Sequence, residues 1–157
     1  MHIRKATPDD AGRISALIHG LSGPLLASPD GFGAEPFLAA ISTTAIAGYI
    51  TSARFRFWVA NNNGVELAGV VALRDCNHLY HLFVAEPFQR RGLASGLWST
   101  AHAAALRAGN PGNFTVNASV NAVPVYQRYG FIVTGPEVRS HGVVFVPMRL
   151  DVRRPGD

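Results

Sequence analysis

The chain has 157 residues, of which 48% are hydrophobic and 15% charged. This length and composition exclude a disordered or fibrous protein and predict one compact domain with a sizeable core. Its one cysteine, Cys76, cannot form a disulfide within the chain, and no Cys-x-x-Cys pair is present to hold zinc. The net charge is +4, but its basic residues are spread along the chain rather than clustered. Because nucleic-acid surfaces concentrate their basic residues, we expect no nucleic-acid partner.

The start of the chain and its longest uncharged stretch argue against a membrane partner. Residues 1–5 lead directly into polar residues and lack the apolar segment of a signal peptide. Residues 36–53 contain five serines and threonines, which makes them too polar to span a bilayer. We therefore expect a cytoplasmic protein in a reducing compartment.

In chain order, the first third of the sequence predicts a strand, a capped helix, a loop and further short helices. Thr7 is expected as the N-cap, Pro8 as the first helical residue and Asp10 as the partner in a capping box. Glycine and proline end this helix and then fill a loop that we expect to be mobile. The expected elements are a strand at 3–6, a helix up to about residue 20, the loop at 22–34, and one or two helices over 37–46 with Ser42 or Thr43 as a cap.

The remainder predicts a strand meander, a long helix and a final group of strands around a short helix. Asn61-Asn62-Asn63-Gly64 is a strong hairpin turn. The expected elements are strands at 55–60, 67–73 and 78–84, a helix at 90–108, a strand at 114–118, a helix at 122–129, and strands at 130–134 and 143–150. This order predicts an α+β fold with a mixed central sheet flanked by helices, in one domain over residues 1–151, followed by a polar C-terminal tail at 152–157.

Several familiar chemical motifs are absent from the sequence. A P-loop is excluded because the only lysine is Lys5, and neither G-x-G-x-x-G nor G-x-S-x-G occurs. His78 and His81 are three residues apart on a predicted strand, a spacing that places them on opposite faces. We therefore expect no metal site.

The strand–turn–helix junction at residues 82–94 is the segment that suggests a ligand. The first turn of a helix presents unpaired N–H groups and the positive end of the helix dipole, which together bind phosphate. Gly92 would let a pyrophosphate approach the backbone, and Arg90 and Arg91 add positive charge. The same residues also fit a glycine tolerated in a first turn beside two surface arginines, and spacing does not decide between these interpretations.

Two segments resemble motifs of the GNAT (GCN5-related) N-acetyltransferase family. Residues 89–94, QRRGLA, are similar to its Q/R-x-x-G-x-G/A acetyl-CoA motif, and the preceding strand ends in the family's Leu-x-Val-x-x-Pro pattern. Residues 122–131, AVPVYQRYGF, resemble its A-x-x-x-Y-x-x-x-G-F segment. The resemblance covers nearly the whole chain and implies a single-domain acyl-CoA N-acyltransferase fold. It also implies acetyl-CoA as the co-substrate.

The resemblance implies a set of cofactor contacts. The amides of residues 91–95 would hold the pyrophosphate, and the backbone of residues 82–84 would pair with the pantetheine arm. Ser119 occupies a position where the family often has an asparagine, so Asn117 or Asn121 could take over that contact. The implied cofactor-binding residues are Leu82, Phe83, Val84, Gln89, Arg90, Arg91, Gly92, Leu93, Ala94, Ser95, Ser119 and Asn121.

The resemblance also implies catalytic roles. Tyr126 stands where the family commonly protonates the departing CoA thiolate; without the motif it would be interpreted as an amphipathic core tyrosine. His78 stands where several members place a general base, although a surface histidine with water as the base fits equally well. Tyr80 is expected on the same face as His78, and Tyr80, Phe32 and Phe37 are the expected acceptor-binding residues.

The leading hypothesis is an acetyl-CoA-dependent N-acetyltransferase in which a primary amine attacks the thioester directly. The acceptor would be a small molecule or peptide, bound by the first helices, the loop at 22–34 and the 135–143 connection. Few carboxylates lie in these segments, so nothing indicates a polycationic acceptor. The alternative is a non-catalytic acyl-CoA-binding module with the same fold. A homodimer is compatible with either.

Overall fold

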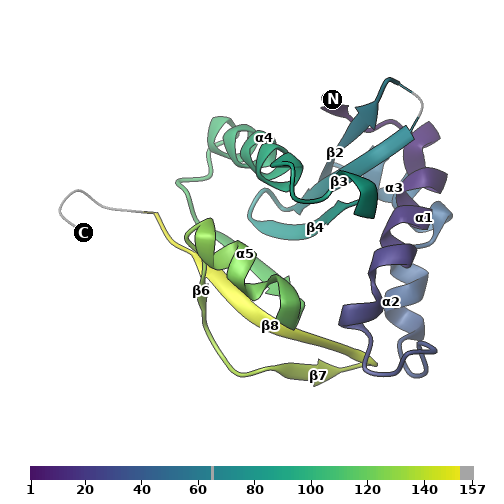
Figure 1. Cartoon of the computed structure of the whole chain (residues 1–157). Helices are drawn as coiled ribbons and strands as arrows, with labels where there is room; N and C mark the ends of the chain where they lie inside the picture. Colours follow the sequence, from purple (N-terminus) through teal and green to yellow (C-terminus); the bar gives the residue numbers. More distant parts are fainter. Residues whose placement is uncertain (65, 153–157) are drawn as a thin grey trace.

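The computed structural model describes residues 1–64 and 66–152 (Figure 1). Most of the expected C-terminal tail, residues 153–157, lies outside the described residues. In chain order the elements are β1 (His2–Lys5), η1 (Pro8–Asp10), α1 (Ala11–Leu21), η2 (Gly23–Leu25), α2 (Glu35–Ala40), α3 (Thr43–Thr51), β2 (Phe55–Asn62), β3 (Glu66–Arg74), β4 (His78–Val84), η3 (Glu86–Phe88), α4 (Leu93–Arg107), β5 (Phe114–Ala118), η4 (Val120–Ala122), α5 (Val123–Arg128), β6 (Ile132–Val133), β7 (Val138–Ser140) and β8 (Val143–Leu150), where η marks 3₁₀ turns.

The strands form a mixed sheet flanked by helices, which confirms the predicted fold class. The strand order is β1-β2-β3-β4-β5-β8-β6, with β7 paired to β8. The pairings are antiparallel apart from β4 with β5, which is parallel. Helices α4 and α5 pack on one face of the sheet, and α1 and α3 pack on the other (Figure 1). No helix among residues 1–64 and 66–152 is long and apolar enough to cross a membrane.

Gly69 of β3 leaves room for a side chain of α4 to pack directly against the sheet, because it has no side chain of its own. A Cβ at this position would stand 2.8 Å from Leu97 Cδ1 and 3.0 Å from the Phe83 carbonyl oxygen. Leu97 is fully buried in the core under α4. Any larger residue at position 69 would therefore push α4, and the loop that precedes it, away from the end of β4.

The beginning of the first helix differs in detail from the predicted start. Residues 8–10 form a 3₁₀ turn, and the α-helix proper begins at Ala11. The predicted partner Asp10 accepts a hydrogen bond from the Thr7 backbone N–H at 2.7 Å. It also accepts two from the guanidinium of Arg4, at 2.8 and 2.9 Å. The ion pair with Arg4 lowers the pKa of the buried Asp10 to about 2. Asp10 thus ties β1 to the start of α1.

Helix α4 begins three residues later than predicted. Arg90 and Gly92 have φ values of 64° and 79°, in the left-handed region that a right-handed helix cannot include. The segment before Leu93 is therefore a loop with Gly92 as the N-cap. Within α4, Trp98 is buried, whereas Ala108, the last residue of the predicted helix, is exposed beyond the observed helix end.

The expected placement of His78 and His81 on opposite faces of their strand is wrong, because β4 contains a bulge. In the pairing with β3, Leu79 opposes Leu73 and His81 opposes Ala72, so Tyr80 has no counterpart. One inserted residue reverses the alternation of side chains. His78 opposes Arg74 on the same face as Ala72, and this places both histidines on one side of the sheet.

Strands β4 and β5 separate shortly after they meet. Their pairing consists of His78 with Thr115 and Leu79 with Val116. Beyond Leu79, β4 remains paired to β3 through Val84, while β5 continues beside β8. The sheet therefore opens between residues 80–84 and residues 117–118, near its centre.

Candidate functional site

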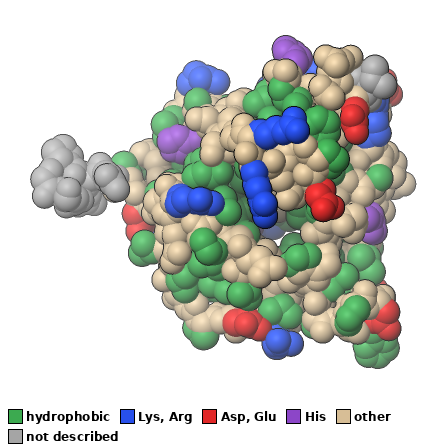
Figure 2. Space-filling view, viewed as in Figure 1, with side chains coloured by type: hydrophobic (Ala, Val, Ile, Leu, Met, Phe, Trp, Pro, Cys, Tyr) green, Lys and Arg blue, Asp and Glu red, His purple; other side chains and the backbone are tan. Residues whose placement is uncertain are grey.

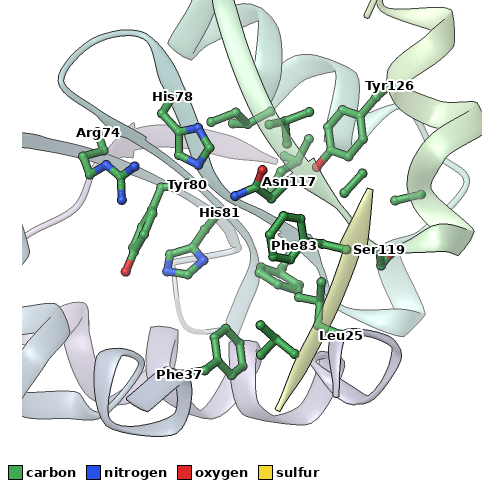
Figure 3. A pocket seen from close by; sticks show the side chains of 17 residues that line it. Leu25, Phe37, Arg74, His78, Tyr80, His81, Phe83, Asn117, Ser119 and Tyr126 are labelled. Carbon is green, nitrogen blue, oxygen red and sulfur yellow. The ribbon is translucent and has the colours of Figure 1, made fainter. Parts of the chain in front are cut away.

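A cavity of about 240 Å³ fills the opening between β4 and β5 (Figure 3). Its walls come from β4, β5 and α5, and its floor from the loop between α1 and α2 and from β8. Figure 3 shows polar groups from separate elements facing one another across this space. They are Arg74, His78, Tyr80, His81, Asn117, Ser119 and Tyr126.

His78 lies at the end of the cavity where β4 and β5 are still paired. Its Nδ1 is 2.7 Å from Thr115 Oγ1, which orients the ring and leaves Nε2 for a ligand. Burial, followed by the positive charge of Arg74, lowers the pKa of His78 to about 4, and Asp75 partly opposes that shift. His78 is therefore neutral at pH 7 and can accept a proton or a hydrogen bond.

His81 is a cavity residue that the sequence analysis did not include in the site. Its side chain is only 5% exposed, and among the described residues its Nε2 has no hydrogen-bond partner. Burial, with a smaller contribution from His78, lowers the pKa of His81 to about 3. The ring packs against Tyr80, with ring centroids 4.3 Å apart. No pattern in the sequence announces the bulge that turns His81 toward this face.

Tyr80 and Arg74 line one side of the cavity, at the left of Figure 3. The guanidinium carbon of Arg74 lies 5.5 Å from the Tyr80 ring centroid, a cation–π contact. Burial, with a contribution from Tyr49, raises the pKa of Tyr80 to about 12. Tyr80 is therefore a protonated hydrogen-bonding group throughout the physiological range, and Arg74 is the cation nearest to it.

Tyr126 enters the cavity from α5. It is 7% exposed and packs against Tyr129 and Phe131, with ring centroids 6.2 and 5.7 Å away. Burial, followed by Tyr129, raises its pKa, so the phenol keeps its proton. Figure 3 shows its hydroxyl directed into the cavity toward Asn117. A protonated phenol in this position can donate a proton to a departing group.

Ser119 and the two asparagines that could replace the family's cofactor-binding asparagine do not all lie in the cavity. Ser119 and Asn117 both line the cavity. Asn121 is exposed in η4 and is not part of the cavity wall. Of the two asparagines that flank Ser119, only Asn117 therefore lies where it could make the contact that the family's asparagine usually makes.

The loop that precedes α4 is exposed and shaped by its own backbone. The Gln89 side chain donates a hydrogen bond to the Val84 carbonyl at 2.9 Å, which fixes the loop to the end of β4. A Cβ at Gly92 would meet no atom within 4 Å, so the space outside this glycine is open. The N–H groups of the first helical turn, Leu93–Ser95, point along the helix axis into that space.

The surface around this loop is basic and suits an anionic ligand. Arg90 and Arg91 are exposed, and both lie within the left-handed turn, in which Arg90 and Gly92 have positive φ. Figure 2 shows lysine or arginine side chains beside a hollow on this face, together with an acidic side chain on its other side. Ser95 Oγ lies 3.2 Å from Tyr129 Oη, which links the start of α4 to α5. Unpaired amides, a helix dipole and basic side chains together provide the chemistry that binds phosphate.

Leu82 and Phe83 connect the exposed loop to the cavity. Both line the cavity, and they lie on the part of β4 that no longer pairs with β5. Alternate backbone groups of a strand point to its two sides, so those of Leu82 and Phe83 directed away from β3 face the opening. An extended ligand could pair with this edge as an added strand.

The loop at 22–34, expected to be mobile, is held against the hairpin formed by β7 and β8. Leu26 pairs with Val143, and the Ala27 N–H donates to the Gly142 carbonyl at 2.8 Å. This contact brings Leu25 to the floor of the cavity beside Phe37. Phe32, expected to bind the acceptor, is 78% exposed and does not line the cavity.

Residues 1–64 and 66–152 contain no group of three or more His, Cys, Asp or Glu side chains that could hold a metal ion. The reversed alternation at the bulge brings His78 and His81 to one face, but no third ligand joins them.

Comparisons with known proteins agree with this architecture. The family model for an acetyltransferase (GNAT) domain matches residues 25–152. No curated protein sequence matches the chain. A GCN5-related N-acetyltransferase from Rhodopseudomonas palustris is similar in structure, with a TM-score of 0.78 at 20% identity, covering 96% of this chain and 95% of that one.

Several of the similar structures contain coenzyme A, and two of them illustrate the likeness. The PaiA N-acetyltransferase of Thermoplasma acidophilum, in complex with coenzyme A, has a TM-score of 0.71 at 15% identity and covers 95% of this chain and 97% of its own. An aminoglycoside 6′-N-acetyltransferase, also complexed with coenzyme A, has a TM-score of 0.72 at 11% identity, with both chains covered completely. At these identities the likeness shows a shared fold.

Proposed function

Since the chain belongs to the GNAT acetyltransferase family, we propose that it transfers the acetyl group of acetyl-CoA to a primary amine. The observation that carries this proposal is the continuity of three features along β4. A phosphate-suited loop at Gly92 is followed by the open edge of Leu82 and Phe83, and then by the cavity that contains His78 and Tyr126. One extended ligand could occupy all three.

Acetyl-CoA fits this path by its chemistry. Its pyrophosphate would lie against the amides of residues 91–95, where the structure leaves space outside Gly92. Its pantetheine arm would pair with the edge at Leu82 and Phe83, and its thioester would reach the cavity. The coenzyme A bound to two structurally similar proteins supports this assignment.

The cavity residues suit a direct transfer from sulfur to nitrogen. The amine nitrogen forms a bond to the thioester carbonyl carbon, and the carbon–sulfur bond breaks. Neutral His78 accepts the proton that the amine loses, and the phenol of Tyr126 donates a proton to the departing sulfur. His78 is a weak base, but attack on the carbonyl makes the nitrogen far more acidic than a free ammonium, so a weak base suffices. Water remains the alternative base.

A non-catalytic acyl-CoA-binding module is the second candidate. It would need the loop at Gly92 and the open edge of β4 but neither ionisable group in the cavity. The presence of both His78 and Tyr126 in the cavity wall favours the enzyme.

The proposal is tested by measuring coenzyme A release from acetyl-CoA with a panel of small-molecule amines and peptides. Acetyl transfer to at least one primary amine, identified by mass spectrometry, is the expected result. Calorimetry on the same protein provides the dissociation constant of acetyl-CoA. Tight binding without turnover on any acceptor would contradict the enzyme and support the module. The homodimer stays a prediction for sedimentation measurements.

A further inference from the structure

The charges around the cavity indicate what kind of amine it accepts. No aspartate or glutamate is among the described residues that line the cavity. Arg74 is the lining side chain that carries a full charge at neutral pH, because both histidines have lowered pKa values. An acceptor with several ammonium groups would find no carboxylate in the cavity lining and would be repelled by Arg74.

Arg74 is oriented toward the cavity and has little anionic competition. It lies opposite His78 in the β3–β4 pairing, on the same face of the sheet. The neighbouring carboxylate of Asp75 is held by Arg54 through two bonds of 3.1 and 3.0 Å, and its distance to Arg74 Nε is 4.0 Å. The guanidinium of Arg74 therefore has N–H donors that can bind the carboxylate of a ligand at the rim of the cavity.

The opposite part of the cavity is apolar. Leu25, Phe37, Phe83, Val143 and Phe145 come together there from four elements of the chain. The Nε2 atom of His81 is buried on the same face and has no partner among the described residues. An unpaired buried nitrogen costs free energy that a polar group of a bound molecule would recover.

We propose that the acceptor is an amine of the α-amino acid type with an apolar side chain, and that Arg74 binds its carboxylate. The amine and carboxylate of such a molecule share one carbon, and opposed residues on adjacent strands have Cβ atoms about 5 Å apart. The carboxylate at Arg74 thus places the amine near His78, while the side chain fills the apolar part. This inference rests on the proposed acetyl transfer and specifies its acceptor.

The environment of the two histidines agrees with this acceptor. Burial and Arg74 disfavour the cationic form of His78. The same surroundings disfavour an ammonium and favour the neutral amine, which is the form that attacks a thioester. A carboxylate on the acceptor compensates the charge of Arg74 without adding a cation.

The test compares each amino acid with its amide, which lacks the negative charge and has a less basic amine, so kcat/KM is expressed per concentration of neutral amine. Leucine, phenylalanine and tryptophan, their amides, and spermidine are assayed with acetyl-CoA on the wild-type protein, on Arg74→Gln and on Arg149→Gln. Arg149 is an exposed arginine that pairs with Asp151 away from the cavity. In the wild type, kcat/KM for at least one amino acid should exceed that for its amide by about 10- to 100-fold, the range of a charged hydrogen bond.

Arg74→Gln should remove that preference by lowering kcat/KM for the amino acid while leaving the amide within about twofold, and Arg149→Gln should change neither. Equal or better turnover of the amides or spermidine would overturn the inference while upholding acetyl transfer. An equal loss for acid and amide in Arg74→Gln would also overturn it, since it would indicate a structural role for Arg74.

A binding measurement keeps the inference testable if no amine is acetylated. The N-acetylated amino acids and their amides are titrated into the protein saturated with coenzyme A and followed by NMR. A preference for the acids that Arg74→Gln abolishes would support the acceptor class even though acetyl transfer had failed. Equal binding of acids and amides, or binding of neither, would overturn the inference.

Discussion

The two ends of β4 recognise ligands in different ways. At its start, His78 and Leu79 pair with strands on both sides, and residues 78–81 direct bulky, ionisable side chains into a partly closed cavity. At its end, residues 82–84 have separated from β5, and the chain continues into the exposed loop around Gly92. The first region depends on which side chains are present, and the second on the course of the backbone. Removing a side chain should therefore have a large effect at the start of β4 and a small one near Gly92, whereas a change that blocks the backbone should have a large effect near Gly92.

The largest effect is expected from adding bulk and negative charge at the backbone end. Gly92→Glu would place a carboxylate in the open space where we propose the pyrophosphate, and should weaken acetyl-CoA binding more than about 100-fold. Calorimetry measures the dissociation constant.

Two further variants separate the causes of that effect. Gly92→Ala adds only strain at a φ of 79° and should cost about 1–2 kcal/mol of folding or binding free energy. Arg91→Ala removes a side chain but no amide and should weaken binding only a few-fold, about 1 kcal/mol or less. If Gly92→Glu bound acetyl-CoA as tightly as the wild type, the proposal that the backbone at the end of β4 binds the pyrophosphate would be wrong.

At the side-chain end, the loss of a single hydroxyl should be visible in catalysis but not in cofactor binding. Tyr126→Phe is expected to lower kcat by about 10²–10⁴-fold while the dissociation constant of acetyl-CoA stays within a few-fold. The reason is that the phenol is needed when the thiolate departs. Thermal denaturation checks that the buried site remains intact. An unchanged kcat, under conditions where chemistry limits the rate, would exclude the role of Tyr126.

His78 should affect the rate and its pH dependence to a smaller extent, because water can replace it. His78→Gln is expected to lower kcat/KM by about tenfold or more. Since its pKa is lowered from 6.5 to about 4, His78 is mostly protonated and inactive only below about pH 4, and the wild-type rate should rise with pH through that value. Above it, the rate should follow deprotonation of the acceptor amine. A profile of kcat/KM against pH that is identical in wild type and variant would assign the proton to water.

The smallest expected effect concerns stability. His81 is neutral and buried, with its pKa lowered from 6.5 to about 3, so stability is fully present above pH 6.5 and declines toward pH 3. As the pH falls from about 7.5 to 5.5, the unfolded chain binds a proton that buried His81 does not, and the free energy of unfolding should fall by about 1 kcal/mol. His81→Phe should remove this contribution and flatten the dependence measured by urea denaturation. An equal slope in both proteins would show that His81 is not held neutral.

Local sequence patterns were sufficient for most of the fold. The strands at 78–84, 114–118 and 143–150 have the predicted limits, because their alternating or continuous apolar residues are bounded by turn-forming residues. The loop before α4 was assigned to the helix, since nothing in Arg90 itself indicates a left-handed conformation. The sequence does not predict the short strand β7, because one half-buried residue followed by two exposed ones carries no clear period.

The sequence by itself determined the family resemblance and the order of elements, and through that resemblance it singled out Gly92, Tyr126 and His78 as candidates, since the motifs consist of residues close together in the chain. Only the tertiary structure decided that His81, Arg74 and Asn117 join the site. The bulge at Tyr80 reverses the face of His81, and the separation of β4 from β5 opens the space that Asn117 lines. Both follow from how strands pair across long stretches of sequence, and pairing register is not written in the residues of any single strand.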